Sequence, residues 1–414
     1  MLGLLLRART YRRLLAAQVV ALAGTGLATV ALGLLAFRLA GDDASRVMAT
    51  ALTIKMVCYV VAGPLLAGLT VRLPRRAVLV GSDAVRAGAV AVLPWADQLW
   101  QVYALVALLQ TASAAFTPAF QALIPEIVDD ADYTSALALS RLAYDLEAVA
   151  SPALAAALLL AVPFSGLFVC TAAGFAASAL LVAGTRLPGS TGRGSPSRLA
   201  GALGGMRAFA ARPPLRALAA LNLAVAAPTA LVLVDTVVYV RGPLGGTDTG
   251  VALALGCFGA GSMAVALTLP HLPMPAGVRP VMLAGPVLAA AAAGALAAGW
   301  AIAPGPVPLA AAWAALGAGC SLVATLTGRV LRDSGADCGL PPLFAAQFSL
   351  SHACFLATYP LAGWAGTQLA PEAAFAGTAA VSAVAGGAAA LLWRGAVPTP
   401  APVAVRTRAA AGRS

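Results

Sequence analysis

The sequence has very little charge. Only 10% of its 414 residues are charged and 61% are hydrophobic, whereas roughly 25% of a soluble globular domain is charged. With a mean hydropathy of +0.90, the composition excludes a water-soluble protein. A membrane-spanning helix takes about 20 apolar residues and a short connection about ten more, so the chain has room for about twelve spans.

Lysine, cysteine and aromatic residues are also scarce. The net charge of +11 comes almost entirely from arginine, because Lys55 is the single lysine. The apolar composition argues against nucleic acid as the partner of this positive charge. Five of the six cysteines, namely Cys58, Cys170, Cys257, Cys320 and Cys354, fall within apolar runs, whereas Cys338 stands in a loop. Their spacing fits neither a disulfide framework nor a metal site, so we expect no metal and no cofactor.

Long apolar runs dominate the rest of the chain and define its predicted topology. The predicted spans are 13–38, 47–69, 77–95, 99–121, 134–161, 164–185, 216–240, 250–270, 280–302, 306–328, 341–367 and 372–393. With the N-terminus inside, twenty arginines lie in cytoplasmic segments and three, Arg38, Arg46 and Arg241, lie outside. Because basic residues favour the cytoplasmic side, this asymmetry predicts an even number of spans with both termini in the cytoplasm.

A basic stretch rich in glycine, serine and proline divides the chain into two halves. We therefore predict an all-α polytopic membrane protein, with an N-terminal six-helix bundle at 1–187, a basic cytoplasmic linker at 188–214, a C-terminal six-helix bundle at 215–395 and a disordered cytoplasmic tail at 396–414. Within the linker, apolar residues recur at helical spacing at Leu199, Leu203, Met206 and Phe209. Such a helix would lie along the inner membrane surface; the alternative is a flexible linker.

The loop after the second span carries a recognisable motif. It runs Gly63-Pro64-Leu65-Leu66-Ala67-Gly68-Leu69-Thr70-Val71-Arg72-Leu73-Pro74-Arg75-Arg76. Together with the two six-helix halves, this loop resembles the major facilitator superfamily. The resemblance implies a cytoplasmic latch formed by Arg72, Arg75 and Arg76, although Val71 replaces the superfamily's aspartate. Asp83 and Arg86, one turn apart, would replace part of that latch or form a structural ion pair.

A second stretch, 116–156, resembles the macrolide-efflux and drug–proton antiporter branch. It contains Phe116-Thr117-Pro118-Ala119, Ala122-Leu123-Ile124-Pro125-Glu126 and Ser151-Pro152-Ala153-Leu154-Ala155-Ala156. In the last block, Ser151, Pro152, Ala155 and Ala156 are similar to the branch's Gly-Pro-x-x-Gly-Gly helix-packing motif. The resemblance implies export coupled to protons, by a protein that works as a monomer.

The fifth span carries the ionisable residues that we consider first for proton coupling. At about 1.5 Å per residue, Asp145 lies roughly 16 Å deep and Glu147 roughly 20 Å, close to the midplane where transporters bind substrate. Arg141 shares a helix face with Asp145, whereas Glu147 points elsewhere. A carboxyl group in low dielectric is suited to loading and releasing protons near neutral pH. The alternative is that both acids are structural partners of basic residues.

Other polar residues inside spans supply further candidates. Lys55 in the second span and Asp235 in the seventh lie at similar depths and form a candidate outer gate, although sequence gives depth without direction. Gln110, Asn222 and His352 are candidate polar groups of a largely apolar cavity. For His352, the alternatives are a hydrogen-bonded packing role and a proton relay.

Together these features predict a secondary active transporter, with proton-coupled efflux of a lipophilic or amphiphilic small molecule, in a bacterial inner membrane. An uncoupled or uptake permease of the same fold is the first alternative. A remote alternative is a magnesium-dependent intramembrane prenyltransferase, suggested by the acidic loops Asp129-Asp130-Ala131-Asp132 and Asp333-Ser334-Gly335-Ala336-Asp337. The partners expected are the small-molecule substrate, protons and the lipid bilayer.

Overall fold

The computed structural model describes residues 8–62, 73–128, 136, 139–140, 143, 147, 151, 153–187, 198–334 and 340–395. These segments are helical and contain no strand. The helices are α2 (Arg9–Ala40), α3 (Ala44–Val57), α5 (Arg75–Val92), α6 (Leu99–Ile127), α8 (Phe164–Ala183), α9 (Arg198–Ala211), α10 (Pro213–Arg241), α11 (Asp248–Thr268), α12 (Val278–Trp300), α13 (Pro306–Asp333), α14 (Leu340–Gln368) and α15 (Pro371–Leu392). A π-helical turn, Cys58–Ala62, extends α3.

The helices agree closely with the predicted spans. Every predicted span except the fifth has its own helix; of the fifth span, the described part contains the stretch 153–161, helical from 153 to 159, and a few residues before it. By length and composition, nine stretches of the described residues qualify as membrane spans, the first of which, Arg9–Val60, contains both α2 and α3. Large apolar side chains cover the outer surface; Leu180, Ile302 and Val384, for instance, are each more than 70% exposed. The prediction of an all-α polytopic membrane protein is confirmed.

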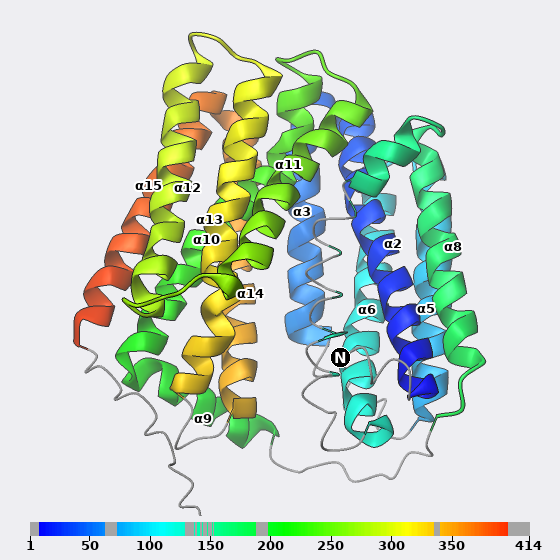
Figure 1. Cartoon of the computed structure of the whole chain (residues 1–414). Coiled ribbons are helices and arrows are strands. Elements are labelled where there is room, and N and C mark those ends of the chain that lie inside the picture. The colour runs from blue at the N-terminus through cyan, green and yellow to red at the C-terminus, as the bar shows by residue number, and fades with distance from the viewer. Residues whose placement is uncertain are drawn as a thin grey trace, which may run out of the picture.

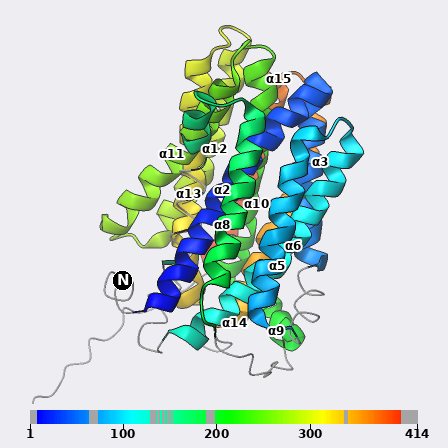
Figure 2. The same cartoon turned by 90° about the vertical axis from the view of Figure 1, so that its right-hand side faces the viewer.

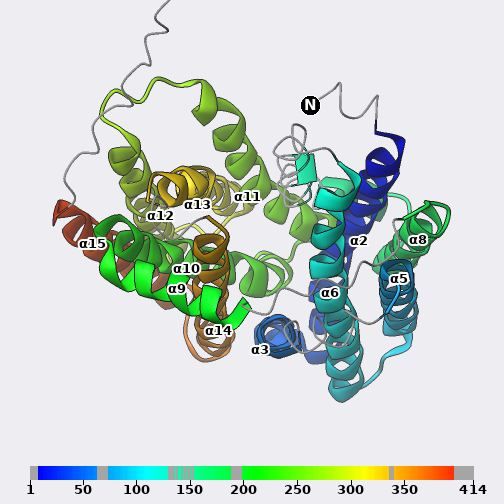
Figure 3. The ribbon, with the colours of Figure 1, turned by 90° about the horizontal axis from the view of Figure 1, so that it is seen from below.

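The helices gather into two halves. Figure 3 shows α2, α5, α6 and α8 on one side and α10, α12, α13, α14 and α15 on the other, and within each half these helices pack against one another. Viewed from the side, α8 lies between α2 and α5 and contacts both (Figure 2). α3 belongs to the first half in sequence, but it packs closely against α14 of the second. It is therefore the main helix through which the halves meet.

The two ends of the bundle differ. α2 begins and α15 ends at the same end, where α9 also lies, which we call the terminal end; the opposite end is the distal end (Figure 1). α9 occupies the predicted linker and packs against α14 and α10, with Phe209 buried. This packing attaches the described part of the linker to the C-terminal half.

Glycines allow close helix contact inside the C-terminal half. A Cβ atom added at Gly261 of α11 would lie 1.8 Å from the carbonyl oxygen of Ala314, and one at Gly317 of α13 would lie 1.9 Å from that of Phe258. The backbones of α11 and α13 therefore touch, an arrangement typical of membrane helices, which associate through small residues.

Contacts between the halves concentrate towards the distal end. A Cβ atom at Gly363 of α14 would lie 2.3 Å from Cβ of Ala49 on α3. Nearby, Arg46 donates a 3.4 Å hydrogen bond to Thr367, and the Arg241 guanidinium lies 5.6 Å above the ring of Phe37. These contacts join α3 and α2 to α14 and α10, so the distal end is closed.

Candidate functional site

Lys55 and Glu147 lie together near the middle of the bundle. The ammonium of Lys55 and the carboxylate of Glu147 interact electrostatically, but they form no direct ion pair within the described part of the chain. Both side chains are half-buried. The structure therefore gives Lys55 an acidic neighbour from the fifth span.

Glu147 also packs closely against the first span, α2. A Cβ atom added at Gly26 of α2 would lie 2.9 Å from Oε1 of Glu147 and 2.1 Å from Cβ of Ser151. Only a glycine at this position allows the fifth span to approach α2 so closely. Ser151, Ala155 and Ala156 of the predicted packing motif are all buried. Arg141, Asp145 and Pro152, also predicted in this span, lie outside the described residues.

His352 approaches this pair from the other half. Its Nδ1 atom lies 2.7 Å from the carbonyl oxygen of Phe348, and the two rings stack with centroids 3.8 Å apart. Across the boundary between the halves, the ring centroid of Tyr59 is 6.1 Å away, and Lys55 interacts with the imidazole electrostatically. The structure thus brings Lys55, Glu147 and His352 into one polar group, which we call the central cluster.

A small cavity opens beside Lys55 within the N-terminal half. It has a volume of about 30 Å³, and its polar lining comes from Thr25, Thr29, Lys55, Gln110 and Ser113. Space of this size admits about one or two water molecules. Thr25 and Thr29 of α2 donate their hydroxyl protons to the preceding turn, whereas Gln110 has no side-chain partner in the described part. Gln110 is therefore available to a bound molecule.

Asn222 and Gln347 form a reciprocal amide pair. Asn222 Nδ2 donates to Gln347 Oε1 at 3.2 Å, and Gln347 Nε2 donates to Asn222 Oδ1 at 2.7 Å. The pair links α10 to α14 inside the C-terminal half. Because each amide satisfies the other, the predicted cavity residue Asn222 holds two helices together in this structure.

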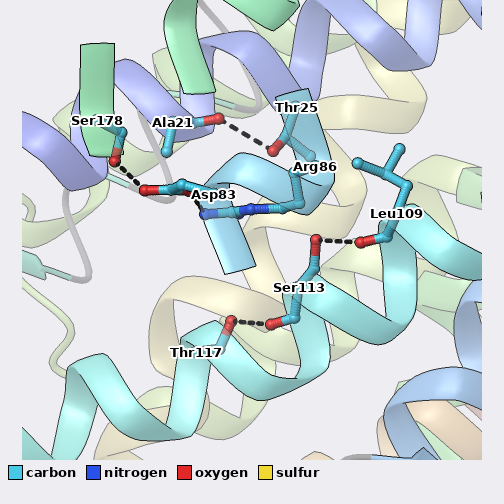
Figure 4. Close-up of polar contacts among 8 residues, drawn as sticks. All are labelled: Ala21, Thr25, Asp83, Arg86, Leu109, Ser113, Thr117 and Ser178. Carbon is cyan, nitrogen blue, oxygen red and sulfur yellow. Dashed lines mark hydrogen bonds and ion pairs between the residues drawn. The ribbon is translucent and has the colours of Figure 1, made fainter. Parts of the chain in front are cut away.

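Asp83 and Arg86 form a buried ion pair inside the N-terminal half. Figure 4 shows the second carboxylate oxygen of Asp83 accepting a 2.7 Å hydrogen bond from Ser178 of α8. The guanidinium lies 4.3 Å above the ring of Phe116 and 4.6 Å above that of Phe175. All these partners belong to the same half, which favours the structural alternative over a part in the latch.

The basic residues of the predicted latch lie at the terminal end. Arg76 donates a hydrogen bond to the carbonyl oxygen of Ala183, at the end of α8, and Arg75 begins α5 beside it. Arg72 and the motif residues 63–71 lie outside the described residues. Arg76 thus contacts its own half.

Asp235 lies at the distal junction, away from Lys55. It is fully buried, and the two residues form no ion pair in the described part of the chain. A Cβ atom added at Gly366 of α14 would lie 2.1 Å from Asp235 Oδ1 and 2.7 Å from Ser45 Oγ. Asp235 of α10, Ser45 of α3 and Gly366 of α14 therefore meet at one point.

Sequence reasoning missed several of these partners. Ser45, Tyr59, Ser178 and Gly366 carry no periodic signal, because a single small or polar residue in an apolar span is common. Of the two acidic loops, Asp333 forms a 4.0 Å ion pair with Arg329, while Asp129–Asp132 and Asp337 lie outside the described residues. The described residues contain no group of three or more metal-binding side chains.

Comparison with known proteins identifies the family. The sequence profile of the Major Facilitator Superfamily matches residues 14–273, which is more than half of the chain. No curated protein sequence matches it.

Solved structures share the fold along nearly the whole chain. The nucleoside transporter NupG has a TM-score of 0.73 at 13% identity, covering 93% of this chain and 99% of its own. A POT family transporter in complex with 5-aminolevulinic acid has a TM-score of 0.70 at 12% identity, covering 93% and 96%.

A third structure is a bacterial homologue of the human lysosomal transporter Spinster, in an inward-facing and unoccupied conformation. Its TM-score is 0.69 at 12% identity, covering 94% of this chain and 98% of its own. At these identities the likeness shows the fold, and the profile match shows the family. The chain belongs to the Major Facilitator Superfamily and is a multi-pass membrane transporter, not an enzyme.

Proposed function

We propose that this transporter exports a lipophilic or amphiphilic small molecule in exchange for protons. It acts as a monomer in a bacterial inner membrane, with the terminal end facing the cytoplasm. The observation that carries the proposal is the position of Glu147, at mid-depth, against α2 and beside Lys55.

The central cluster combines the charges that a proton carrier needs. An ionisable group inside a span is costly unless paired or hydrated, so it marks an ion pathway by default. Glu147 is attracted to Lys55 without touching it, which leaves the carboxylate free to gain a proton without first breaking a tight ion pair. Protonation removes the counter-charge of Lys55 and so changes the electrostatic balance between α2, α3 and the fifth span.

The surroundings of the cluster suit an apolar substrate. The walls of the cavity beside Lys55 are mostly Ala, Leu, Val and Phe side chains, with three hydroxyls, one amide and the Lys55 ammonium. At about 30 Å³ the cavity itself holds only water in this conformation, so a substrate would bind there only after the walls move apart. An apolar lining with sparse polar groups binds molecules largely by burying hydrophobic area. The distal end is closed by contacts of α3 with α14, a state through which an exporter must pass when it takes up its substrate from the terminal side.

Proton release from inside-out membrane vesicles tests the proposal. The vesicles are energised to an acidic lumen, and a pH-sensitive dye follows the lumen while a panel of lipophilic antibiotics is added. We expect compound-triggered proton release from wild-type vesicles and its loss in Glu147→Gln, with Asp145→Asn run alongside. Asp248→Asn is the matched control, since Asp248 is a partly exposed acid paired with Arg241 at 3.5 Å.

The outcome also separates the alternatives within the same fold. Labelled compound that equilibrates across the membrane with no proton release would overturn coupling and establish an uncoupled permease. If the Glu147→Gln variant releases as many protons as the wild type, Glu147 is not the proton carrier. Proton-driven accumulation towards the terminal side would identify uptake instead of export.

A further inference from the structure

The distal junction contains a fully buried acid with no compensating charge. Asp235 has no exposed surface, and neither of its carboxylate oxygens has a hydrogen-bond partner among the described residues. Two polar groups lie beside the carboxylate: Ser45 Oγ, which is within hydrogen-bonding reach, and the hydroxyl of Tyr239. Neither hydroxyl forms a hydrogen bond of normal geometry within the described part of the chain.

This acid lies where the two halves of the molecule meet at the distal end. Asp235 comes from α10 and the facing hydroxyl from α3, while Gly366 of α14 closes the contact so tightly that a Cβ atom would overlap the carboxylate. One turn earlier, Gly363 approaches Ala49 and the carbonyl oxygen of Ser45 in the same way. Opening the distal end must pull Ser45 away from Asp235 and admit water to the carboxylate.

Ionisable groups on the neighbouring helices are engaged elsewhere. On α3, Arg46 pairs with Asp43 at 3.5 Å and Lys55 faces Glu147. At the distal ends of α10 and α11, Arg241 pairs with Asp248. On α15, Glu372 adds negative charge near Tyr239, one turn after Asp235.

The remaining charged groups lie at other positions. On α14, His352 belongs to the central cluster. On α2, Arg38 donates to the carbonyl oxygens of Pro94 and Ala96. The others on helices that pack against α10 lie at the terminal end: Arg9, Arg12, Arg13, Arg207, Arg279, Arg329, Arg332, Asp333 and Arg394. The described surroundings of Asp235 therefore supply no cation.

We propose that Asp235 is a second proton-binding site, which holds the distal end closed when protonated and releases it when ionised. A protonated carboxyl group can donate a hydrogen bond to Ser45 Oγ across the two halves. An ionised carboxylate in the same place is buried without a counter-charge, a state that burial strongly disfavours. Deprotonation therefore favours the hydrated, distally open state, and the proton exchanges with the solution on the distal side.

The proposal does not depend on Glu147 as the transported proton's carrier. Linkage of one proton to an opening equilibrium changes the ratio of closed to open molecules by up to about tenfold per pH unit. Because Asp235 lies at the distal junction and Glu147 in the central cluster, Glu147→Gln leaves this pH response in place. Failure of proton-coupled export and failure of the distal site are thus distinguishable.

Electron spin resonance distances test the site on the full chain in lipid nanodiscs. Spin labels replace Asp42 and Leu369, two exposed distal positions in different halves, in a background whose six cysteines are replaced by alanine. We expect the short, closed distance to dominate at pH 5.5 and a longer distance to gain population by pH 8.5. In Asp235→Asn, whose amide mimics the neutral acid, the closed distance should persist at both pH values.

Two further variants keep the test decisive if Asp235→Asn does not fold. Ser45→Ala removes the hydrogen-bond acceptor and should move the transition to more acidic pH. Gly366→Ala introduces a methyl group at the junction and should favour the open distance at every pH, whereas Gly377→Ala, which has open space around its Cβ position, should behave as wild type.

Three results would overturn the proposal. The first is a wild-type distance distribution that is the same at pH 5.5 and pH 8.5. The second is an Asp235→Asn protein whose distances shift with pH as in the wild type. The third is a Ser45→Ala protein with an unchanged transition.

Discussion

Two aspartates, Asp83 and Asp235, are equally buried but differently surrounded. Asp83, inside the N-terminal half, has Arg86 as its counter-ion and Ser178 as a hydrogen-bond donor. Asp235, between the halves, has no hydrogen-bond partner in the described structure. Burial alone therefore does not distinguish a structural acid from one whose charge changes during function. The partners distinguish them, because a satisfied acid stabilises one conformation and an unsatisfied one favours a change.

The largest expected effect is the loss of the satisfied acid. Asp83→Ala leaves the Arg86 guanidinium buried between two phenylalanine rings without its anion. Removing one partner of a buried ion pair destabilises a protein by about 3–5 kcal/mol, so we expect a strong fall in the thermal unfolding temperature of the purified protein. The double variant Asp83→Leu with Arg86→Met removes both charges and should recover most of the loss. An Asp83→Ala protein as stable as wild type would break the comparison.

The unsatisfied acid should behave in the opposite way. Asp235→Asn removes a carboxylate that is buried without a counter-charge when ionised, so it should stabilise the protein at pH 8.5, by about 1–3 kcal/mol. At pH 5.5 the wild-type acid is already neutral under our proposal, and the difference should shrink. Thermal unfolding at the two pH values measures this. Equal destabilisation at both would mean that Asp235 has a structural partner after all.

A smaller effect is expected at the reciprocal amide pair. Asn222→Ala leaves the Gln347 amide without its partner, which should cost about 1 kcal/mol in the free energy of unfolding. Replacing both residues by leucine removes the unsatisfied amide and should be nearly neutral. A chemical denaturation series on the single and double variants measures the coupling, and purely additive losses would show that the two amides act independently.

The smallest effect is expected at the exposed ion pair of Arg46 and Asp43, whose side chains are 56% and 61% exposed. Exposed ion pairs contribute about 0.2–1 kcal/mol, and solvent screens this one. Arg46→Ala should therefore leave the unfolding temperature almost unchanged, although it also removes the hydrogen bond to Thr367. A loss as large as that of Asp83→Ala would show that the distal closure depends on surface charge.

Much of the fold could be predicted from the sequence, because hydropathy directly reflects the requirement that a span be apolar over its length. The predicted range 216–240, for example, coincides with α10 to within a few residues. The count of residues placed Lys55 and Asp235 at similar depths, whereas the structure has Asp235 beside Ser45 at the distal junction and Lys55 beside Glu147 in the central cluster. A hydropathy pattern gives the depth of a residue only approximately, and it does not say which neighbouring helix the residue faces.

The site shows the same limit in detail. Asn222 is recognisable in the sequence as a polar residue in an apolar span, but only the packing of α10 on α14 shows that Gln347 is its partner. Ser178 looked like an ordinary small residue of α8 until the structure placed it on Asp83. Close approach also depends on glycines such as Gly26, whose importance is visible only from the atoms that a Cβ would meet.

The central claim is that Glu147, an acid without a tight ion-pair partner, carries the transported proton, whereas Asp83, which is paired with Arg86, stabilises the fold. Compound-triggered proton release from inside-out vesicles, normalised to the amount of folded protein, tests it with Glu147→Gln beside Asp83→Asn. We predict that Glu147→Gln folds normally and releases no protons, whereas Asp83→Asn is less stable but releases protons from each folded molecule. Normal release by Glu147→Gln, or its complete loss in folded Asp83→Asn, would contradict the account.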